Sequence, residues 1–274
     1  GKCSVVKIKT AQELIDLFEN SVGNVKNDIE LVSDLDFSSS NLTLPLGAFS
    51  DDTMVAFSGV LNGNGHSIKG IRMDNENNAG YDSAGLFHSL KNAIVENLVI
   101  DSSCSFTGNH TGALSVSVDG SLSVKHTTNN AAVNGDWEVG GFIGYVEDLK
   151  QPGVVSFEDC VNNGNVTGSG HDVGGFIGHI WCNSNITMAI VNSINNGKIT
   201  GTFDVGGFVG DIYSSDSDYI TLDITNSVNK GSVSAEEYMA CGFFCVYSYD
   251  NMNVKTTMKN SINKGSVNAG TNGY

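Results

Sequence analysis

Three acidic residues occupy the same place in a recurring segment, since Glu138, Asp172 and Asp204 each stand directly before a Val-Gly-Gly-Phe-x-Gly sequence. If the segments stack as parallel strands, neighbouring carboxylates lie about 5 Å apart. That spacing suits a Ca²⁺ site built from carboxylate oxygens, or the carboxylate pair of a retaining glycoside hydrolase. Solvated turn residues, among which aspartate is common, are the plainer interpretation. Calcium therefore enters only as a candidate, and no other cofactor is expected.

The other catalytic residue types are not arranged for chemistry. Six histidines are scattered along the chain, and although His171 and His179 flank one recurring segment, no motif places a Ser or Cys nucleophile with them. Arg72 is the one arginine, and the net charge is −16, which disfavours binding of polyuronates. We therefore expect no enzymatic activity. A polysaccharide lyase or glycoside hydrolase that uses Glu138, Asp172 and Asp204 is the alternative.

Variable segments follow each recurring sequence, over residues 147–153, 181–185, 213–219 and 248–253. Recognition commonly depends on variable loops carried by a regular scaffold, and aromatic rings with carboxylates suit a sugar or a basic protein patch. The sequence therefore predicts a ligand-binding edge, although the same rings would also serve to cover the edge of the scaffold. The candidate residues are Trp181, Tyr213, Tyr219, Tyr247, Tyr249, Asp216 and Asp218.

An internal repeat must position these residues. The Val-Gly-Gly-Phe sequence begins at Val139, Val173 and Val205, and a degenerate copy begins at Ala240, at offsets of 34, 32 and 35 residues. A second sequence, Cys160-Val-Asn-Asn-Gly-Asn-Val-Thr-Gly168, recurs with the same phase. Apolar residues alternate within each repeat and β-branched residues abound, which indicates strands rather than helices. Units that cannot bury a face alone must stack.

The predicted fold is an all-β, right-handed parallel β-helix of about seven coils with repeats of about 33 residues. Amide side chains in register should bond from coil to coil. Glycines that follow them should supply left-handed backbone at the corners. The two columns are Asn162, Asn195, Asn229 and Asn263, and Gly164, Gly197, Gly231 and Gly265.

The two ends of the chain differ. Residues 10–22 predict an amphipathic capping helix, with Thr10 and Glu13 as a capping box and Leu14, Leu17, Phe18 and Val22 on one face. We expect residues 1–54 to form this cap with lead-in strands and residues 55–274 to form the β-helix. The carboxyl end carries no comparable cap. We therefore expect the chain to be part of a longer protein, or further repeats or a partner to cover that end.

Composition excludes several classes. A strongly acidic chain repels nucleic acid, and no apolar stretch approaches the roughly 18 residues of a membrane-spanning helix. The candidate glycosylation sites are Asn41, Asn109, Asn165 and Asn185. The cysteines are Cys3, Cys104, Cys160, Cys182, Cys241 and Cys245. On one extended strand Cys241 and Cys245 would stand roughly 13 Å apart, so we expect no bond between them. Small buried thiols are the expectation for the set.

The two recurring sequences together resemble the GLUG-type repeat, and Phe57-Ser-Gly-Val-Leu-Asn-Gly-Asn-Gly-His-Ser-Ile-Lys-Gly-Ile71 resembles the coil that opens such proteins. The likeness covers roughly residues 10 to 269 and departs where Cys241 and Cys245 replace two glycines. It implies a pectate-lyase-like β-helix on or outside cells of bacteria or mucosal protists, often an adhesin or surface antigen. We therefore predict an extracellular or cell-surface adhesin that binds a host or surface glycan or protein without catalysis. A rigid spacer is a third reading.

Overall fold

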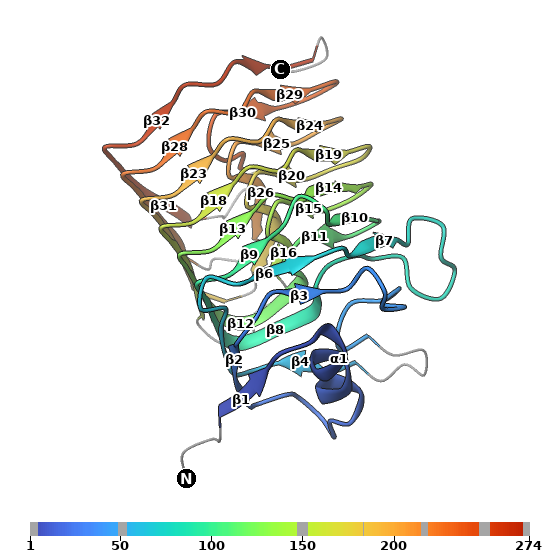
Figure 1. Cartoon of the computed structure of the whole chain (residues 1–274). Coiled ribbons are helices and arrows are strands. Elements are labelled where there is room, and N and C mark those ends of the chain that lie inside the picture. The colour runs from blue at the N-terminus through green and yellow to red at the C-terminus, as the bar shows by residue number, and fades with distance from the viewer. Residues whose placement is uncertain are drawn as a thin grey trace.

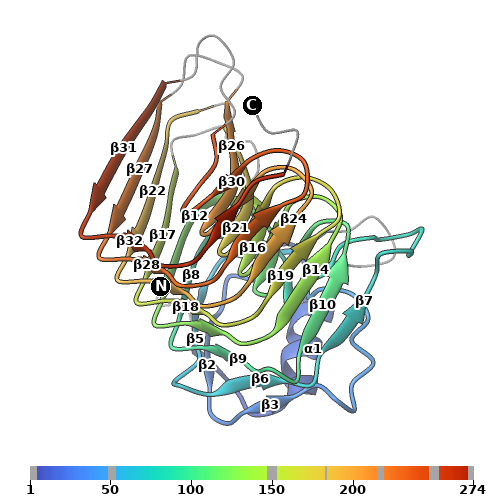
Figure 2. The ribbon, with the colours of Figure 1, turned by 90° about the horizontal axis from the view of Figure 1, so that it is seen from above.

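The computed structural model describes residues 5–48, 54–146, 153–182, 184–214, 219–246 and 253–270. In these residues the chain winds into a parallel β-helix of about seven turns, with the N-terminal part at one end of the stack and the C-terminal part at the other (Figure 1). Figure 2 shows the same stack from above, with the strands of successive coils lying over one another. The repeat therefore predicted the fold class correctly.

Four sheets form the walls of the β-helix. The largest has 13 strands, in which the long strands β8 and β12 lead into two arms: β16, β21 and β26 on one side, and β17, β22, β27 and β31 on the other. Its strands are β1 (Val5–Ile8), β2 (Asp28–Leu31), β4 (Ala56–Phe57), β5 (Val60–Asn62), β8 (Phe87–Glu96), β12 (Ser115–Lys125), β16 (Ile143–Val146), β17 (Gly153–Glu158), β21 (Ile177–Cys182), β22 (Ile186–Val191), β26 (Val209–Ser214), β27 (Tyr219–Thr225) and β31 (Asn253–Lys259).

The other three sheets have eight, seven and five strands. The eight are β3 (Leu35–Asp36), β6 (Ser67–Lys69), β9 (Val99–Ile100), β13 (Thr128–Asn129), β18 (Val161–Asn162), β23 (Ile194–Asn195), β28 (Val228–Asn229) and β32 (Ile262–Asn263). The seven are β7 (Arg72–Asp74), β10 (Ser105–Gly108), β14 (Ala132–Gly135), β19 (Val166–Gly168), β24 (Ile199–Gly201), β29 (Val233–Ala235) and β33 (Val267–Asn268). The five are β11 (Thr111–Gly112), β15 (Val139–Gly140), β20 (Val173–Gly174), β25 (Val205–Gly206) and β30 (Ala240–Cys241).

The register follows the aligned sequence columns. Val155 pairs with Met188 and Met188 with Leu222, so apolar side chains stack on the inner face of β17, β22 and β27, where all three are buried. The phenylalanine of the recurring sequence forms a second internal stack, with ring centroids 5.0 Å apart from Phe142 to Phe176 and 4.8 Å apart from Phe176 to Phe208. Inward apolar columns therefore form one continuous core along the axis.

The stacking begins earlier in the chain than residue 55. β1 pairs with β2, and β2 pairs with β5, all in parallel. Between β1 and β2 lies the helix α1 (Ala11–Glu19), at the N-terminal end of the stack (Figure 1). The residue range 1–54 therefore contributes its own rungs to the β-helix in addition to the cap.

The capping helix is present but shorter than predicted. The capping box of Thr10 and Glu13 forms, and Phe18 packs against Phe87 with ring centroids 5.6 Å apart. The helix ends at Glu19, so the prediction for Val22 is wrong: this residue lies beyond the helix and is fully exposed. Ile15 is buried on the inner face instead. The cap thus covers the phenylalanine core through Ala11, Leu14, Ile15 and Phe18, a different set from the one that the pattern suggested.

The asparagine ladder is confirmed, whereas the reason assigned to the glycines is wrong. Asn162 Nδ2 donates to Asn195 Oδ1 at 2.9 Å, and Asn195 Nδ2 donates to Asn229 Oδ1 at 2.8 Å, both buried. Gly197 does not have a positive φ. Glycine is needed there because a Cβ would lie 1.9 Å from the carbonyl oxygen of Gly164 in the coil below. The left-handed residues are instead polar residues at another corner, among them Asp159, Asn192, Asn226 and Asn260.

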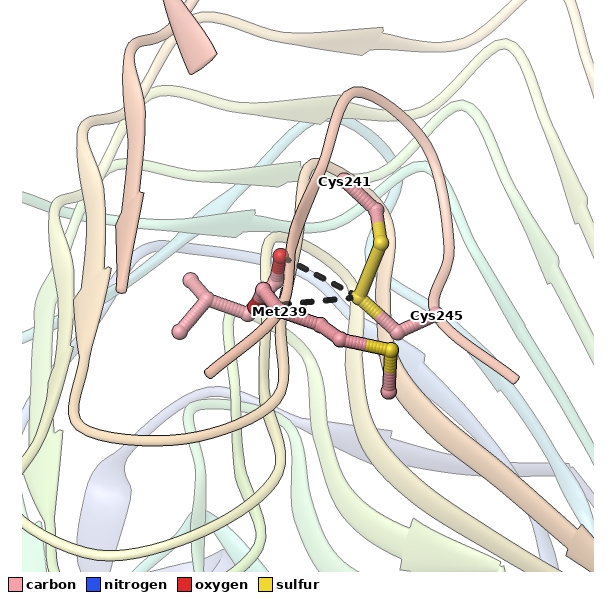
Figure 3. The surroundings of a disulfide bond; sticks show 4 residues. Met239, Cys241 and Cys245 are labelled. Atoms are coloured by element: carbon pink, nitrogen blue, oxygen red, sulfur yellow. Dashed lines mark hydrogen bonds between the residues drawn. A yellow bond between two sulfur atoms is a disulfide. The ribbon is translucent and has the colours of Figure 1, made fainter. Parts of the chain in front are cut away.

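The expectation that Cys241 and Cys245 cannot bond is also wrong, since they form a disulfide with a Cα–Cα distance of 5.7 Å (Figure 3). The expectation assumed one extended strand, but β30 ends at Cys241 and the chain turns before Cys245. Cys104 and Cys160 are free, buried thiols, as expected. Burial raises the pKa of Cys160 to about 12. Cys3 and the side chain of Cys182 lie outside what the structure describes.

Candidate functional site

The carboxylate column lies at the corner that precedes β15, β20 and β25. Val139 pairs with Val173 and Val173 with Val205, so the residues before them, Glu138, Asp172 and Asp204, stack in successive coils. Glu138 and Asp172 have φ values of 46° and 60°, in the left-handed region. Non-glycine residues in that region are held by their surroundings and often mark functional sites. The predicted stacking of these three residues in successive coils is therefore confirmed.

A second column, on the outward face of β16, β21 and β26, meets the carboxylates at the same corner. Tyr145 pairs with His179, and His179 pairs with Asp211. His179 Nδ1 lies 3.2 Å from Asp172 Oδ2 and 3.6 Å from Asp211 Oδ2. We call Glu138, Asp172, Asp204, His179 and Asp211 the acidic corner. Sequence reasoning missed Asp211, although its position six residues after Val205 matches that of His179 after Val173.

Residues of the acidic corner, together with the neighbouring His171, form two overlapping groups with the spacing of metal ligands. One group is Glu138, Asp172 and His179, and the other is His171, Asp172 and Asp204; within each group the candidate ligand atoms lie within 4.8 Å of one another. The column expected to supply only carboxylate oxygens is therefore shared between two groups that each contain an imidazole. Mixed nitrogen and oxygen donors favour transition metals over calcium.

The pKa shifts reflect crowded negative charge. Burial raises the pKa of Asp204 to about 6 and that of Asp211 to about 7, and the nearby charge of Asp172 adds to both shifts. Burial opposes protonation of His179, yet Asp172, with help from Glu138 and Asp211, raises its pKa. Around neutral pH the acidic corner therefore holds more negative charge than burial favours, and protons or another cation must balance it.

An aromatic ladder runs beside the acidic corner, in the column one residue earlier. His171 stacks between Trp137 and Phe203, with ring centroids 4.8 Å and 4.0 Å away, and Phe203 contacts Tyr238 at 5.3 Å. The rings contact one another, so the ladder binds successive coils together, and all its members except Trp137 line the pocket described next. The signal that could have found it was present, because each member directly precedes the carboxylate column or its equivalent.

A pocket of about 370 Å³ opens between this ladder and the acidic corner. It brings the two predicted sites together, because Tyr213, a predicted ligand-binding residue, lines it together with the carboxylates. The lining residues are His171, Asp172, Phe203, Asp204, Asp211, Tyr213 and Tyr238. No lysine or arginine is among them, so the pocket disfavours anionic ligands.

The other predicted binding residues are distributed along the same edge. Trp181 on β21 pairs with Tyr213 on β26, and its side chain is 46% exposed. Tyr219 begins β27 and is 61% exposed. The predicted residues Tyr247, Tyr249, Asp216 and Asp218 lie outside the described residues.

The candidate glycosylation sites differ in their surroundings. Asn41, Asn165 and Asn185 are exposed. Asn109 is partly buried, and its Nδ2 donates to Asp82 Oδ2 at 3.1 Å. Because glycans attach to Nδ2, Asn109 is the least accessible acceptor of the four.

The fold defines the class: this is a parallel β-helix repeat protein. The whole chain resembles the crystal structure of a "putative immunoglobulin A1 protease" from Bacteroides ovatus, with a TM-score of 0.68 over 96% of this chain and 82% of that one. The sequence identity is 15%, so this likeness shows the fold alone. Among the described residues, no helix has the length and apolar character to cross a membrane.

The sequence comparisons are narrower. Over a stretch of 142 residues, which makes up 48% of this chain, the sequence is 30% identical to halomucin from Haloquadratum walsbyi. The matched part is 2% of halomucin, so this chain corresponds to a small piece of that relative. No protein-family model matches the chain, and the GLUG-type assignment therefore stays a prediction.

Proposed function

We propose that this chain is an extracellular recognition module that binds a glycan on a host or other surface, without turning it over. The observation that carries the proposal is the pairing of Trp181 with Tyr213 on adjacent strands, next to the pocket of the acidic corner. An exposed indole beside a phenol offers apolar ring surface, and the carboxylates accept hydrogen bonds from sugar hydroxyls. The partial likeness to a protein named halomucin supports an extracellular location.

The charge of this edge limits the kinds of sugar that can bind. The pocket presents Asp172, Asp204 and Asp211 and is lined by no lysine or arginine, so a neutral or amine-bearing sugar fits better than a uronate or a sulfated sugar. The rigid β-helix fixes the rings before the ligand arrives, which lowers the entropy cost of binding.

One observation favours a second candidate, a glycoside hydrolase. Asp172 and Asp204 lie within 4.8 Å of each other, close to the separation in retaining enzymes, and the pKa of Asp204 is raised to about 6. A carboxyl whose pKa is raised towards neutrality, beside a second carboxyl, is the pattern expected of a general acid and its partner. Release of reducing ends from plant or mucosal polysaccharides, abolished in Asp204→Asn, would replace the binding proposal with this one.

The test is binding of the labelled, purified chain to epithelial cells, with and without glycosidase treatment of the cells. We expect saturable binding that is lost after treatment. Replacing both Trp181 and Tyr213 by alanine should weaken it at least about tenfold, because each aromatic contact is worth about 1 kcal/mol. Far-UV circular dichroism of the variant should stay unchanged.

Trp137→Ala is the matched control. Trp137 is also 46% exposed, but it stacks on His171 in the ladder. We expect this variant to bind as the wild type does. Failure of the wild-type chain to bind cells at any accessible concentration would contradict the proposal. If the chain showed neither binding nor turnover, the rigid spacer would be the favoured function.

A further inference from the structure

One imidazole nitrogen of the acidic corner, His179 Nδ1, lacks the hydrogen bond that its burial demands. Among the described residues, the buried side-chain atoms without a hydrogen-bond partner are Ser58 Oγ, His110 Nδ1 and His179 Nδ1. His110 Nδ1 lies 2.8 Å from Glu138 Oε2, and His179 belongs to the metal-spaced group that contains Glu138. An unsatisfied buried polar atom costs about 1–3 kcal/mol. Because His179 Nδ1 lies within a group that has the spacing of metal ligands, its unsatisfied state suggests a missing binding partner.

We propose that Glu138, Asp172 and His179 bind a divalent first-row transition-metal ion such as Zn²⁺ or Mn²⁺. Metal–ligand distances of about 2.0–2.1 Å place adjacent ligand atoms of a tetrahedral site about 3.3–3.4 Å apart. The 3.2 Å between His179 Nδ1 and Asp172 Oδ2 fits that edge, without the geometry of a hydrogen bond. Asp211 Oδ2, 3.6 Å from the same nitrogen, is within reach as a further ligand.

The donor set and the charge both select this kind of ion. Calcium requires six to eight oxygen ligands, whereas one imidazole with two or three carboxylates suits zinc or manganese. The ion pairs of Glu138 and Asp172 at the acidic corner are formed with histidines. A divalent cation would add to the compensation of carboxylate charge that the histidines provide.

The surroundings hold two of the ligands in place. Glu138 and Asp172 project from left-handed backbone positions. His110 lies against the Glu138 carboxylate, in the position of an outer residue that orients a ligand. The neighbouring group with His171 is the weaker choice, because its imidazole is stacked between Trp137 and Phe203 and leaves no buried nitrogen unsatisfied.

The experiment uses the tag-free full chain after treatment with a chelator. Calorimetric titration with Zn²⁺ and Mn²⁺ should show one ion per chain, and Co²⁺ should give a visible absorption band. His179→Gln and Asp172→Asn should each weaken affinity at least about tenfold. Asparagine tolerates the left-handed backbone at position 172, so the variant should keep its fold.

Asp159→Asn is the matched control. Asp159 has φ of 53° and places Oδ2 3.5 Å from His126 Nδ1, so it is also a left-handed aspartate beside an imidazole, but at a more exposed place. This variant should bind metal like the wild type. If circular dichroism shows that Asp172→Asn does not fold, the metal affinity of His179→Gln alone tests the proposal.

Three results would overturn the proposal. The first is no binding of Zn²⁺, Mn²⁺ or Co²⁺ at millimolar concentration. The second is unchanged metal affinity in His179→Gln. If, in addition, Asp204→Asn alone lost binding, the ion would belong to the group that contains His171. The third is stabilisation by Ca²⁺ alone. Because the readout is metal binding, these results are independent of whether the chain recognises a glycan.

Discussion

At the residue scale, identical positions in successive coils act through contacts with one another. The buried asparagine column forms an unbroken series of amide hydrogen bonds, from Asn129 to Asn162 at 2.9 Å and onward to Asn263. A parallel exposed series joins Asn196 to Asn163 at 2.7 Å. Both series consist of amide hydrogen bonds, so a comparison of the two separates the effect of burial on stability from the effect of hydrogen bonding.

We predict that Asn195→Ala lowers the free energy of unfolding by about 2–3 kcal/mol, because it removes one buried hydrogen bond from each of the amides of Asn162 and Asn229. Asn196→Ala removes an exposed bond and should cost less than about 0.5 kcal/mol. Urea denaturation followed by circular dichroism compares the two. Equal losses would mean that burial does not decide the strength of the ladder.

At the element scale, the coil that contains β30 departs from the others because a disulfide stands where they have two glycines. Gly206 of β25 has its backbone against the carbonyl of Val209, where a Cβ would lie 1.8 Å from the oxygen. Gly206 pairs with Cys241 in the next coil, which therefore cannot keep the same turn. The disulfide to Cys245 closes the altered turn covalently.

We predict that reduction with dithiothreitol speeds amide hydrogen exchange over residues 240–246 about 30-fold, which corresponds to the loss of about 2 kcal/mol for a short closed loop. Exchange in β17 and β22 should stay unchanged, because contacts in a solenoid are made between neighbours.

The control is the variant with serine at both Cys241 and Cys245, in which dithiothreitol should change nothing further. Fast exchange over residues 240–246 before reduction would contradict a structural role for the disulfide.

At the scale of the whole molecule, the spacing of the coils is a collective property. The glycines that follow the asparagine ladder approach the coil below so closely that a methyl group cannot enter. At the C-terminal end of the described stack, Met258, Ile262 and Val267 are exposed, whereas Phe157, Ile190 and Ile224, in the column of Met258, are buried. Each coil thus depends on its neighbours for burial as well as for hydrogen bonds.

We predict that Gly197→Ala destabilises the chain by at least about 3 kcal/mol, because the new methyl group would force two coils apart. The control is Gly23→Ala. Gly23 has φ of +77° but open space around it, so the cost should be about 1 kcal/mol of backbone strain.

Thermal unfolding followed by circular dichroism measures both variants. A small effect of Gly197→Ala would mean that the coils can separate locally, and that their spacing is not collective.

The sequence by itself determined the fold class, the register of the strands, the asparagine ladder and the stacking of Glu138, Asp172 and Asp204. Each of these depends on a residue meeting its own equivalent one repeat later, so the repeat offset is sufficient. The tertiary structure decided what meets across a corner, between columns that belong to different strands. It joined Asp211 and His179 to the carboxylates, placed Tyr213 at the same pocket and brought Cys241 to Cys245. These contacts depend on how sharply the chain turns, and the repeat period carries no information about that angle.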